Sequence, residues 1–430
     1  MKRLLSLFSG CGGMDLGFEG NFWIHEDCIN ETIHPNWIVK KKERWVLLNK
    51  TNFDIVFAND IEKYAYNAWM SYFGKKILGK IFHLNSLVDL IKLSETGNFD
   101  FPNNIDIITG GFPCQDFSVS GKRKGCLSHK SHTGKYLKED EDHFKENRGV
   151  LYQWMIRLID KLSPKIFVVE NVKGLTYLSI SDKIFQDFKQ CSNRGYFVIP
   201  KVLYAPNFGI PQKRERLFLI GLKKEALNSQ VFRIFQDEYQ DELSFKETLN
   251  REFKSVKYFP FPPVTHCSLE DKQNLFNQSL KPYATTKSVL ENLNEPEKEK
   301  KDLSQMKYSK AKFLKKGQGQ IEINLEGLSP TIRAEHHGNI EYRRLSAELG
   351  GNYLDELHQG KMMRRLTVRE CARLQTFPDN FEFVRDKKSD YPLSASQGYK
   401  LIGNAVPPLL AYHLAKRLED LWDYIFVDNY

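Results

Sequence analysis

Short apolar runs alternate with helical stretches through the first half of the chain, and this alternation restricts the fold more than any other feature of the sequence. Buried strands are predicted at residues 3–8, 54–59, 105–109, 166–170 and 216–222. Each run is apolar enough to be covered on both faces, as parallel strands are. Between them, residues 62–72 and 149–162 carry apolar side chains at helical spacing. The alternation predicts an α/β fold with a doubly wound, mostly parallel sheet, whose ligands bind beyond the carboxyl ends of the strands.

The pattern changes after Leu222. Residues 223–362 have weak periodicity and include a charged run at 291–302, which we expect on the surface. Regular structure returns with a capping box at Thr367 and Glu370, and a last helix is expected from Pro407 onward. We therefore expect two domains. The first comprises residues 1–222 and 363–430, and the second, smaller and irregular, comprises 223–362; the polar stretch 21–52 is interpreted as an insertion.

Composition excludes several classes of protein. The 430 residues are 41% hydrophobic and 27% charged, which is typical of globular chains and excludes a disordered or fibrous one. No apolar run approaches the roughly 20 residues that cross a bilayer, so we expect no membrane partner. Seven cysteines without a secretory signal favour free thiols and a cytoplasmic location. The net charge of +9 permits a polyanionic partner.

The first predicted strand leads into a glycine turn at residues 8–13. Glycines let a ligand approach the backbone where any Cβ would clash. Asp60 ends the second predicted strand, where a carboxylate commonly binds the hydroxyls of a ribose. The turn departs from the G-x-G-x-x-G spacing, and Asp60 lies beyond the usual distance of about 20 residues. Nucleoside binding and an ordinary structural turn both remain open from these residues alone.

Three further signals lie at strand ends. Cys114 follows Gly-Gly-Phe-Pro, which places a thiol at the ligand edge of the sheet unless it is a buried core cysteine. Glu170 closes a buried strand, where desolvation raises a carboxyl pKa and lets it hold a proton near neutrality; a helix N-cap or a surface carboxylate is the alternative. Arg214 and Arg216 share one side of an extended segment, which suits binding of a carboxylate, phosphate or carbonyl oxygen, or a salt-bridged strand end.

A metal site is not expected. His25, Cys28 and His34 are close in the sequence, but their spacing fits no standard zinc pattern.

Taken in this order, the motifs resemble those of the DNA (cytosine-5) methyltransferase family. The similar segments are residues 8–13, 110–115, 148–151, 170–172, 212–216, 365–375 and 403–408. The resemblance spans the chain except the stretch 21–52 and the middle segment. It implies a Rossmann-like methyltransferase fold that uses S-adenosyl-L-methionine, together with a smaller DNA-recognition domain. It also implies a type II restriction-modification methylase that acts as a monomer on duplex DNA, alongside a partner restriction endonuclease.

The family chemistry implies a role for each strand-end residue. Cys114 would add to carbon 6 of a cytosine flipped out of the duplex, which turns carbon 5 into a nucleophile toward a methyl group. Glu170 would hold N3 and the exocyclic amine. Arg216 would bind the carbonyl O2, with Arg214 supporting the same site.

The resemblance also implies a cofactor site and DNA contacts. The cofactor residues would be Phe8, Gly10, Gly12, Gly13, Asp60, Ile61, Asn85, Pro113, Leu151, Asn404 and Val406. Asn85 stands where the family usually has an acidic residue facing the adenine amine, and its amide oxygen can accept that hydrogen bond. DNA contacts are expected from the loop 115–147 and from segment 328–338. The candidates are Gln115, Ser118, Lys122, Arg123, Lys124, Arg333, His336 and His337.

Other functions fit part of the sequence. The strand, glycine turn and Asp60 alone would suit a NAD-linked oxidoreductase, which leaves Cys114 and Glu170 unexplained. A non-catalytic nucleic-acid-binding protein would not need those two residues. An RNA (transfer RNA) cytosine-5 methyltransferase would share the same motifs. The large middle segment favours duplex DNA, because reading several base pairs requires extra surface.

Overall fold

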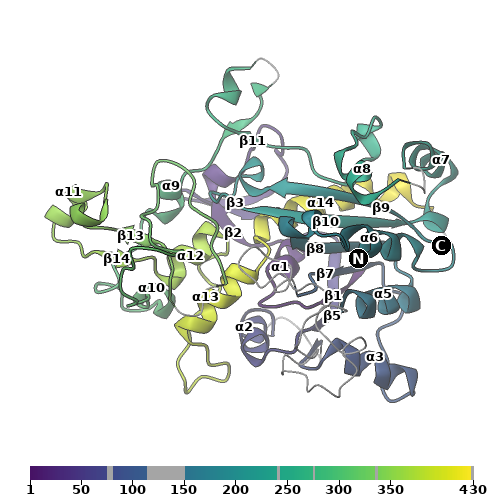
Figure 1. Ribbon diagram of the computed structural model, residues 1–430, viewed down its shortest axis with the longest axis horizontal. Coiled ribbons are helices and arrows are strands. Elements are labelled where there is room, and N and C mark those ends of the chain that lie inside the picture. Colours follow the sequence, from purple (N-terminus) through teal and green to yellow (C-terminus); the bar gives the residue numbers. More distant parts are fainter. Residues whose placement is uncertain (75–80, 114–150, 240–242, 275–276, 335–337, 428–430) are drawn as a thin grey trace.

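A seven-stranded sheet forms the centre of the protein (Figure 1). The computed structural model describes residues 1–74, 81–113, 151–239, 243–274, 277–334 and 338–427. The strand order is β6-β5-β1-β7-β8-β10-β9. Their bounds are β1 Lys2–Leu7, β5 Phe53–Asn59, β6 Phe82–His83, β7 Ile107–Gly110, β8 Ile166–Val172, β9 Tyr196–Tyr204 and β10 Glu215–Lys223. Pairing is parallel from β6 to β8, and β10 runs antiparallel to β8 and β9. The predicted α/β fold with a mostly parallel sheet is confirmed.

All five predicted strands are present in the seven-stranded sheet. Its other two strands, β6 and β9, were not predicted. Strand β9 contains Pro200 opposite Leu219 of β10, followed by Lys201. Proline interrupts an apolar run and cannot donate a ladder hydrogen bond, but an edge strand tolerates it. Strand β6 has two residues and carries no periodic pattern.

Helices cover both faces of the sheet. One face packs against α1 (Gly13–Glu19), α2 (Lys63–Phe73) and α14 (Pro408–Ile425), and the other against α3 (Leu87–Glu95), α5 (Leu151–Leu162) and α6 (Ser181–Gln190). Side chains alternate along β1, so Leu4 belongs to the first core and Leu5 to the second. The predicted helices at 62–72 and 149–162 correspond to α2 and α5, and the last predicted helix is α14.

The C-terminal helix closes onto the start of the chain. An added Cβ at Gly17 of α1 would lie 2.4 Å from the Cβ of Ala411 in α14. The two helices therefore approach each other so closely at this point that a side chain larger than that of glycine would not fit.

The segment 223–362 does not form one separate unit. Its first helices, α7 (Ser229–Glu238) and α8 (Phe245–Asn250), pack on the sheet domain. The ring of Phe235 lies 5.6 Å from Phe197 of β9, and Phe245 lies 5.6 Å from Phe185 of α6. The polypeptide then forms a small parallel pair, β11 (His266–Cys267) with β12 (Lys281–Pro282), before it leaves the sheet.

Residues 284–404, here called the second lobe, lie to the left of the sheet in Figure 1. The lobe contains α9 (Thr286–Leu290), α10 (Leu303–Met306), β13 (Tyr342–Arg344), α11 (Leu354–His358), β14 (Arg364–Arg365), α12 (Val368–Leu374) and α13 (Ala395–Asn404). Its elements are short, and buried arginines hold them together. Arg364 makes two hydrogen bonds to Glu370, of 2.8 and 2.9 Å, and shares Glu295 with Arg344. The capping box of Thr367 and Glu370 is present at the start of α12, as predicted.

The stretch 21–52 forms its own three-stranded antiparallel sheet, in the order β2-β4-β3. The strands are β2 (Trp23–His25), β3 (Ile38–Lys42) and β4 (Trp45–Leu48). This small sheet rests on α14, where the Tyr412 ring lies 5.8 Å from Phe22 and 5.1 Å from Trp37. Within the described part of the chain, no helix has the length and apolar character that a membrane crossing needs.

Candidate active site

Glu170 and Arg216 form an ion pair at the end of the central strands. Strand β10 places Phe218 opposite Glu170 and Arg216 opposite Val172, so the two charged side chains are diagonal neighbours on one face of the sheet. Arg216 Nε lies 2.9 Å from Glu170 Oε1, and the two side chains are 13% and 12% exposed. The pair is therefore almost enclosed, with a narrow opening to solvent.

Burial raises the pKa of Glu170, and the nearby guanidinium groups of Arg216 and Arg214 oppose this rise. Gly111 leaves room beside the carboxylate, because an added Cβ there would lie 2.8 Å from Glu170 Oε2. A carboxyl with a raised pKa can hold a proton, or share one with a bound base. The fixed cation beside it can neutralise negative charge on a neighbouring oxygen of that base.

The residue after Glu170 fixes the segment that leads toward Cys114. Asn171 Nδ2 donates to the carbonyl of Phe112 at 3.3 Å, and Asn171 Oδ1 accepts from the backbone of Val172 at 2.9 Å. The ends of β7 and β8 are thereby joined through one side chain. The next residues, 114–150, lie outside the described part of the structure.

Arg214 is placed differently from Arg216, although only one residue separates them. Its side chain is fully buried and donates to the carbonyls of Ile332 at 3.0 Å, Gly403 at 2.9 Å and Ala405 at 2.8 Å. It thus joins β10 to the second lobe and to the segment before α14. Its support of the site is indirect, through the backbone of these segments and its charge near Glu170.

Two glutamines that sequence reasoning missed complete this junction. Gln212 Oε1 accepts from the backbone of Ile332 at 3.0 Å, and Gln212 Nε2 donates to Gln375 Oε1 at 2.7 Å. Gln375 Nε2 donates in turn to the carbonyl of Ala405 at 3.0 Å. Both side chains are fully buried, but no local pattern indicates that Gln212 and Gln375 contact each other across 163 residues of sequence.

The glycine turn after β1 meets the residues after β5. The Gly10 amide donates to Asp60 Oδ2 at 2.9 Å, and the Glu62 amide donates to Asp60 Oδ1 at 2.9 Å. Burial raises the pKa of Asp60, while these amide donors lower it. Each carboxylate oxygen has a second acceptor position for an additional donor, such as a ribose hydroxyl.

The glycines of the turn have separate structural reasons. An added Cβ at Gly12 would lie 2.6 Å from Phe73, and one at Gly13 would lie 2.4 Å from the carbonyl of Val406. An added Cβ at Gly10 would meet no described atom within 4 Å. Gly12 and Gly13 therefore permit close packing, whereas Gly10 leaves open space beside the turn.

A buried carboxyl beneath the turn was also missed. Asp15 Oδ1 accepts from Ser6 Oγ at 2.5 Å and Asp15 Oδ2 accepts from Trp69 Nε1 at 2.7 Å. Burial raises its pKa to about 6. An acidic residue directly after a glycine turn, between apolar neighbours, is the signal that could have identified it.

The remaining predicted cofactor residues differ in exposure. Asn85 and Asn404 are exposed and Ile61 is 36% exposed, while Phe8 and Pro113 are half-buried. Leu151 and Val406 are buried. The Asn85 carbonyl accepts from Asn59 Nδ2 at 2.8 Å, which places Asn85 next to the end of β5.

Most of the predicted DNA contacts and the predicted nucleophile lie outside the described residues. These are Cys114, Gln115, Ser118, Lys122, Arg123, Lys124, His336 and His337. Arg333 is described and is bound within the second lobe, where Nη2 lies 2.9 Å from Glu341 Oε1. Among the described residues, no three His, Cys, Asp or Glu side chains form a group able to hold a metal ion.

The strand order, with β10 alone reversed among the described strands of the sheet, and the charged side chains at the strand ends are those of a Rossmann-like α/β fold. Solved structures support this fold. The chain resembles Spodoptera frugiperda DNMT2 in a crystallised mutant form (TM-score 0.53, 16% identity, 97% of this chain and 99% of the other). It also resembles the S. pombe Dnmt2 methyltransferase (TM-score 0.52, 16% identity, 98% and 99%).

The sequence places the chain within one family. It matches the model of C-5 cytosine-specific DNA methylases over residues 2–420, and the chain belongs to that family. It is 28% identical to the type II methyltransferase M.NgoFVII of Neisseria gonorrhoeae, over 100% of this chain and 88% of the relative. It is 27% identical to the type II methyltransferase M.HhaI of Haemophilus parahaemolyticus, over 84% and 85%. The predicted family and enzyme class, DNA (cytosine-5-)-methyltransferase, are confirmed.

Proposed function

We propose that the protein methylates carbon 5 of one cytosine within a short duplex DNA sequence, with S-adenosyl-L-methionine as the methyl donor. The observation that carries this proposal is the enclosed Glu170–Arg216 pair at the end of β8, with its raised carboxyl pKa. A cytosine inside a stacked duplex cannot reach such a site, so the base must be flipped out of the helix.

The pair is suited to activate a cytosine ring. Glu170 holds N3 and the exocyclic amine, and Arg216 binds the carbonyl O2, which draws electrons from the ring. The Cys114 thiolate then adds to carbon 6, and carbon 5 becomes nucleophilic. S-adenosyl-L-methionine, when bound, supplies the methyl group. Loss of the proton on carbon 5 and expulsion of the thiolate restore the aromatic ring.

The cofactor fits the turn after β1. Gly10 leaves open space there, and the Asp60 carboxylate beside it retains acceptor capacity for a ribose hydroxyl. Ile61, next to Asp60, offers a partly exposed apolar surface to an adenine ring, and Asn85 offers an exposed amide group beside the end of β5. The remaining predicted cofactor residues stay predictions.

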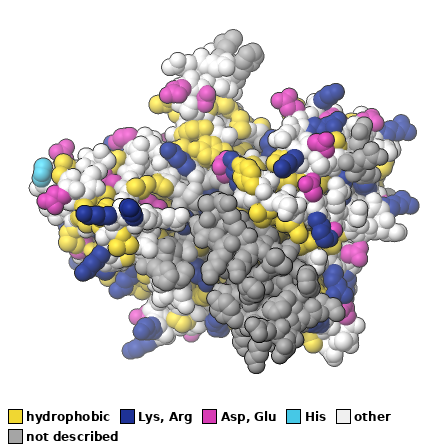
Figure 2. Space-filling model, viewed as in Figure 1, with side chains coloured by type: hydrophobic (Ala, Val, Ile, Leu, Met, Phe, Trp, Pro, Cys, Tyr) yellow, Lys and Arg dark blue, Asp and Glu magenta, His cyan; other side chains and the backbone are white. Residues whose placement is uncertain are grey.

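We assign target reading to the second lobe rather than to all of 223–362, because α7 and α8 cover the sheet. The segment 307–320 contains no acidic residue, and its lysines 310, 312, 315 and 316 are exposed. Figure 2 shows Lys and Arg side chains on this lobe, at the left of the face drawn. Exposed cations of this kind neutralise phosphates, while segment 328–338 would read base edges.

We also propose that the enzyme acts as a monomer and protects DNA from a partner restriction endonuclease, as the type II names of its relatives suggest.

Trapping on a fluorinated base tests the proposed chemistry. Duplex DNA containing 5-fluorocytosine should form a denaturant-stable adduct in the presence of S-adenosyl-L-methionine, because fluorine blocks the final elimination. Cys114→Ser should abolish the adduct, whereas Cys267→Ser in β11 should not. An adduct that survives Cys114→Ser would reject the nucleophile. Labelled methyl transfer to transfer RNA in place of duplex DNA would reject the substrate.

The recognised sequence can be found directly. Methylation-sensitive sequencing of DNA from cells that express the chain should show one short motif modified at carbon 5. That motif then serves as the substrate for the kinetic experiments below.

A further inference from the structure

The insertion 21–52 is anchored to the catalytic domain at its base. The backbone amide of Asn21 donates to the carbonyl of Asn49 at 3.1 Å, which closes the small sheet at the end of α1. Tyr412 of α14 hydrogen-bonds Asn49 and packs against Trp37, and the His34 ring stacks on Trp37 at 3.6 Å. These buried contacts fix the orientation of the insertion relative to the sheet domain.

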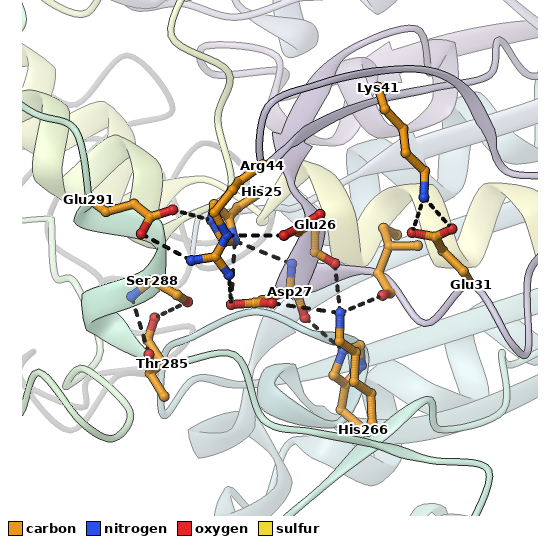
Figure 3. A network of polar contacts seen from close by, with 12 residues as sticks. His25, Glu26, Asp27, Glu31, Lys41, Arg44, His266, Thr285, Ser288 and Glu291 are labelled. Carbon is orange, nitrogen blue, oxygen red and sulfur yellow. Dashed lines mark hydrogen bonds and ion pairs between the residues drawn. The ribbon is translucent and has the colours of Figure 1, made fainter.

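The opposite side of the insertion contacts the second lobe through Arg44, just before β4. Its guanidinium binds three carboxylates at 3.0 Å each: Glu26 and Asp27 of the insertion, and Glu291 at the end of α9 (Figure 3). The buried His25 reinforces the contact, because its Nε2 lies 3.0 Å from the second oxygen of Glu291. Both oxygens of Glu291 are therefore held by the insertion.

A single exposed ion pair contributes little, but this one is part of a network. Without the Arg44 cation, the three carboxylates would face one another with less opposing charge, and the contact would become repulsive. Arg44 is therefore the cation that joins the carboxylates of the insertion to Glu291; Lys281 Nζ also lies 3.8 Å from Asp27 but does not contact Glu291 in these ion pairs.

Further hydrogen bonds continue the junction around β11 and β12. Asn30 Nδ2 donates to the carbonyls of Thr265 at 2.9 Å and Ser279 at 2.8 Å. Lys281 Nζ donates to the carbonyl of Glu26 at 2.9 Å. His266 Nε2 lies 3.1 Å from the carbonyl of Asp27. The insertion thus contacts the polypeptide at the point where it leaves the sheet domain.

The position of Glu291 bears on the segment proposed to read the target. Helix α9, which ends next to Glu291, is hydrogen-bonded to the bend at residues 325–327, just before that segment. The Thr286 amide donates to the carbonyl of Gly327, and the Lys287 amide donates to the carbonyl of Leu325, both at 2.8 Å. The proposed reading segment begins at residue 328. A shift of Glu291 would therefore be carried through a five-residue helix to Gly327.

A second contact runs from the same place to α12. Arg373 of α12 donates to the carbonyl of Glu291 at 2.8 Å, and its guanidinium lies 4.7 Å from the ring centre of Trp45 in β4. Gln375, which follows α12, binds Gln212 next to β10. The insertion, α9 and α12 therefore meet at Glu291.

We propose that the insertion is a brace that sets the orientation of the second lobe, and that Arg44 and His25 are positioning residues for target recognition. They act through Glu291 and α9 and do not touch the cytosine or the cofactor. The inference rests on the proposed function, because it requires segment 328–338 to contact the DNA.

Steady-state kinetics with full-length protein test the proposal. Arg44→Ala should raise the KM for duplex DNA that contains the recognised motif about tenfold, and should reduce discrimination against single-base variants of the motif by a similar factor. Because the chemistry is untouched, kcat and the KM for S-adenosyl-L-methionine should stay within about twofold. Glu291→Gln removes the charge from the other side of the contact. It should likewise raise the KM for DNA and leave kcat and the KM for S-adenosyl-L-methionine nearly unchanged.

Lys41→Ala is the matched control. Lys41 lies in the same small sheet and pairs with Glu31 at 2.6 Å, but this pair lies within the insertion (Figure 3). The control should behave as the wild type. In the double variant Arg44→Ala/Glu291→Gln, the effect on the KM for DNA should be smaller than the product of the single effects.

Three results would overturn the inference while the wild type remains active. These are an Arg44 variant indistinguishable from the Lys41 control, a fall in kcat at unchanged KM for DNA, and full multiplicativity of the double variant. If Arg44→Ala does not fold, Glu291→Gln decides the outcome alone. A wild-type protein that methylates no duplex DNA would instead reject the proposed function.

Discussion

Glu170 of β8 and Arg216 of β10 are paired across antiparallel strands, with 2.9 Å between Oε1 and Nε. The sheet register alone makes them diagonal neighbours on one face. Because β10 runs antiparallel to β8, its first residues lie beside the carboxyl end of β8. A strand reversal thus brings an arginine from residue 216 to a carboxylate at the ligand edge of a parallel sheet.

The Glu170→Gln variant should retain the shape of the pocket but lose the proton that a carboxyl can share with cytosine N3. We expect kcat to fall about 100-fold or more. The Kd for duplex DNA should change by less than about threefold, since phosphate contacts supply most of that affinity. Single-turnover methylation and fluorescence anisotropy measure the two quantities.

Glu215→Gln is the control for this prediction. Glu215 is next to Arg216, is 43% exposed, and pairs with Lys173 at 2.8 Å on the surface. Its loss should leave kcat within about twofold, since exposed pairs contribute little. Equal losses of kcat and DNA affinity in Glu170→Gln would contradict the proton-sharing role.

The sheet and its strand ends could be predicted because their signals are local. Apolar runs marked five of the seven strands, and the motifs after them located Glu170, Arg216 and Asp60. Strand β9 escaped because Pro200 and Lys201 interrupt its apolar run, and an edge strand tolerates both. The positions of Cys114 and of most predicted DNA contacts remain predictions.

The roles that depend on distant contacts could not be predicted. Arg214 and Arg216 form one sequence motif, yet the partners of Arg214 are backbone carbonyls at 332, 403 and 405. Gly12 and Gly13 stay predicted cofactor residues together with Gly10, but the sequence did not indicate that an added Cβ would meet Phe73 at Gly12 and Val406 at Gly13. The insertion likewise had no signal for its contact with Glu291, more than 240 residues away.

Replacing Arg214 with methionine should destabilise the protein. The change leaves the carbonyls of Ile332 and Gly403 without their Arg214 donor, whereas the Ala405 carbonyl keeps the one from Gln375. We expect a loss of about 3 kcal/mol in the free energy of unfolding. Arg216→Met should cost less, about 1 kcal/mol, because Glu170 can take up a proton instead of remaining an unpaired charge. Urea denaturation followed by tryptophan fluorescence gives both values. Equal losses in the two variants would count against a structural role for Arg214 that Arg216 does not share.

Two glycine variants should separate packing from cofactor binding. Gly12 has φ +86° and an added Cβ would lie 2.6 Å from Phe73, so Gly12→Ala should lower the free energy of unfolding by about 2–4 kcal/mol. Gly10→Ala should cost about 1 kcal/mol for its positive φ but raise the Kd for S-adenosyl-L-methionine about tenfold, since the new methyl enters the open space. Calorimetric titration measures the Kd for S-adenosyl-L-methionine. A Kd of Gly10→Ala within about twofold of wild type would refute the assignment of the space beside Gly10 to the cofactor.

Three histidines, buried His266 and His413 and half-buried His34, meet where the insertion, β11 and α14 join. The His34 and His413 rings lie 5.7 Å apart, and His266 is in the same cluster. Burial lowers the pKa of His34 and of His266 to about 4, and lowers that of His413 as well. Lys416 and Lys281 add to the effect at His34 and His266, respectively, whereas the carbonyl of Asp27 opposes it at His266.

This cluster should make the protein sensitive to mild acid. Between pH 6.5 and about 4 the unfolded chain protonates these histidines and the folded protein does not, so stability is complete above pH 6.5 and falls as the pH drops, by about 3 kcal/mol for His266 alone. His413→Phe keeps an aromatic ring against Trp37 and should remove about a third of the loss in this window. Carboxylates with a lowered pKa, such as Glu295 with a pKa of about 2, stabilise the folded protein throughout this window. Their contribution is lost only as the pH falls further, toward 2. Urea midpoints measured from pH 7.5 to 4 test this, and an unchanged slope in His413→Phe would exclude the cluster as the cause.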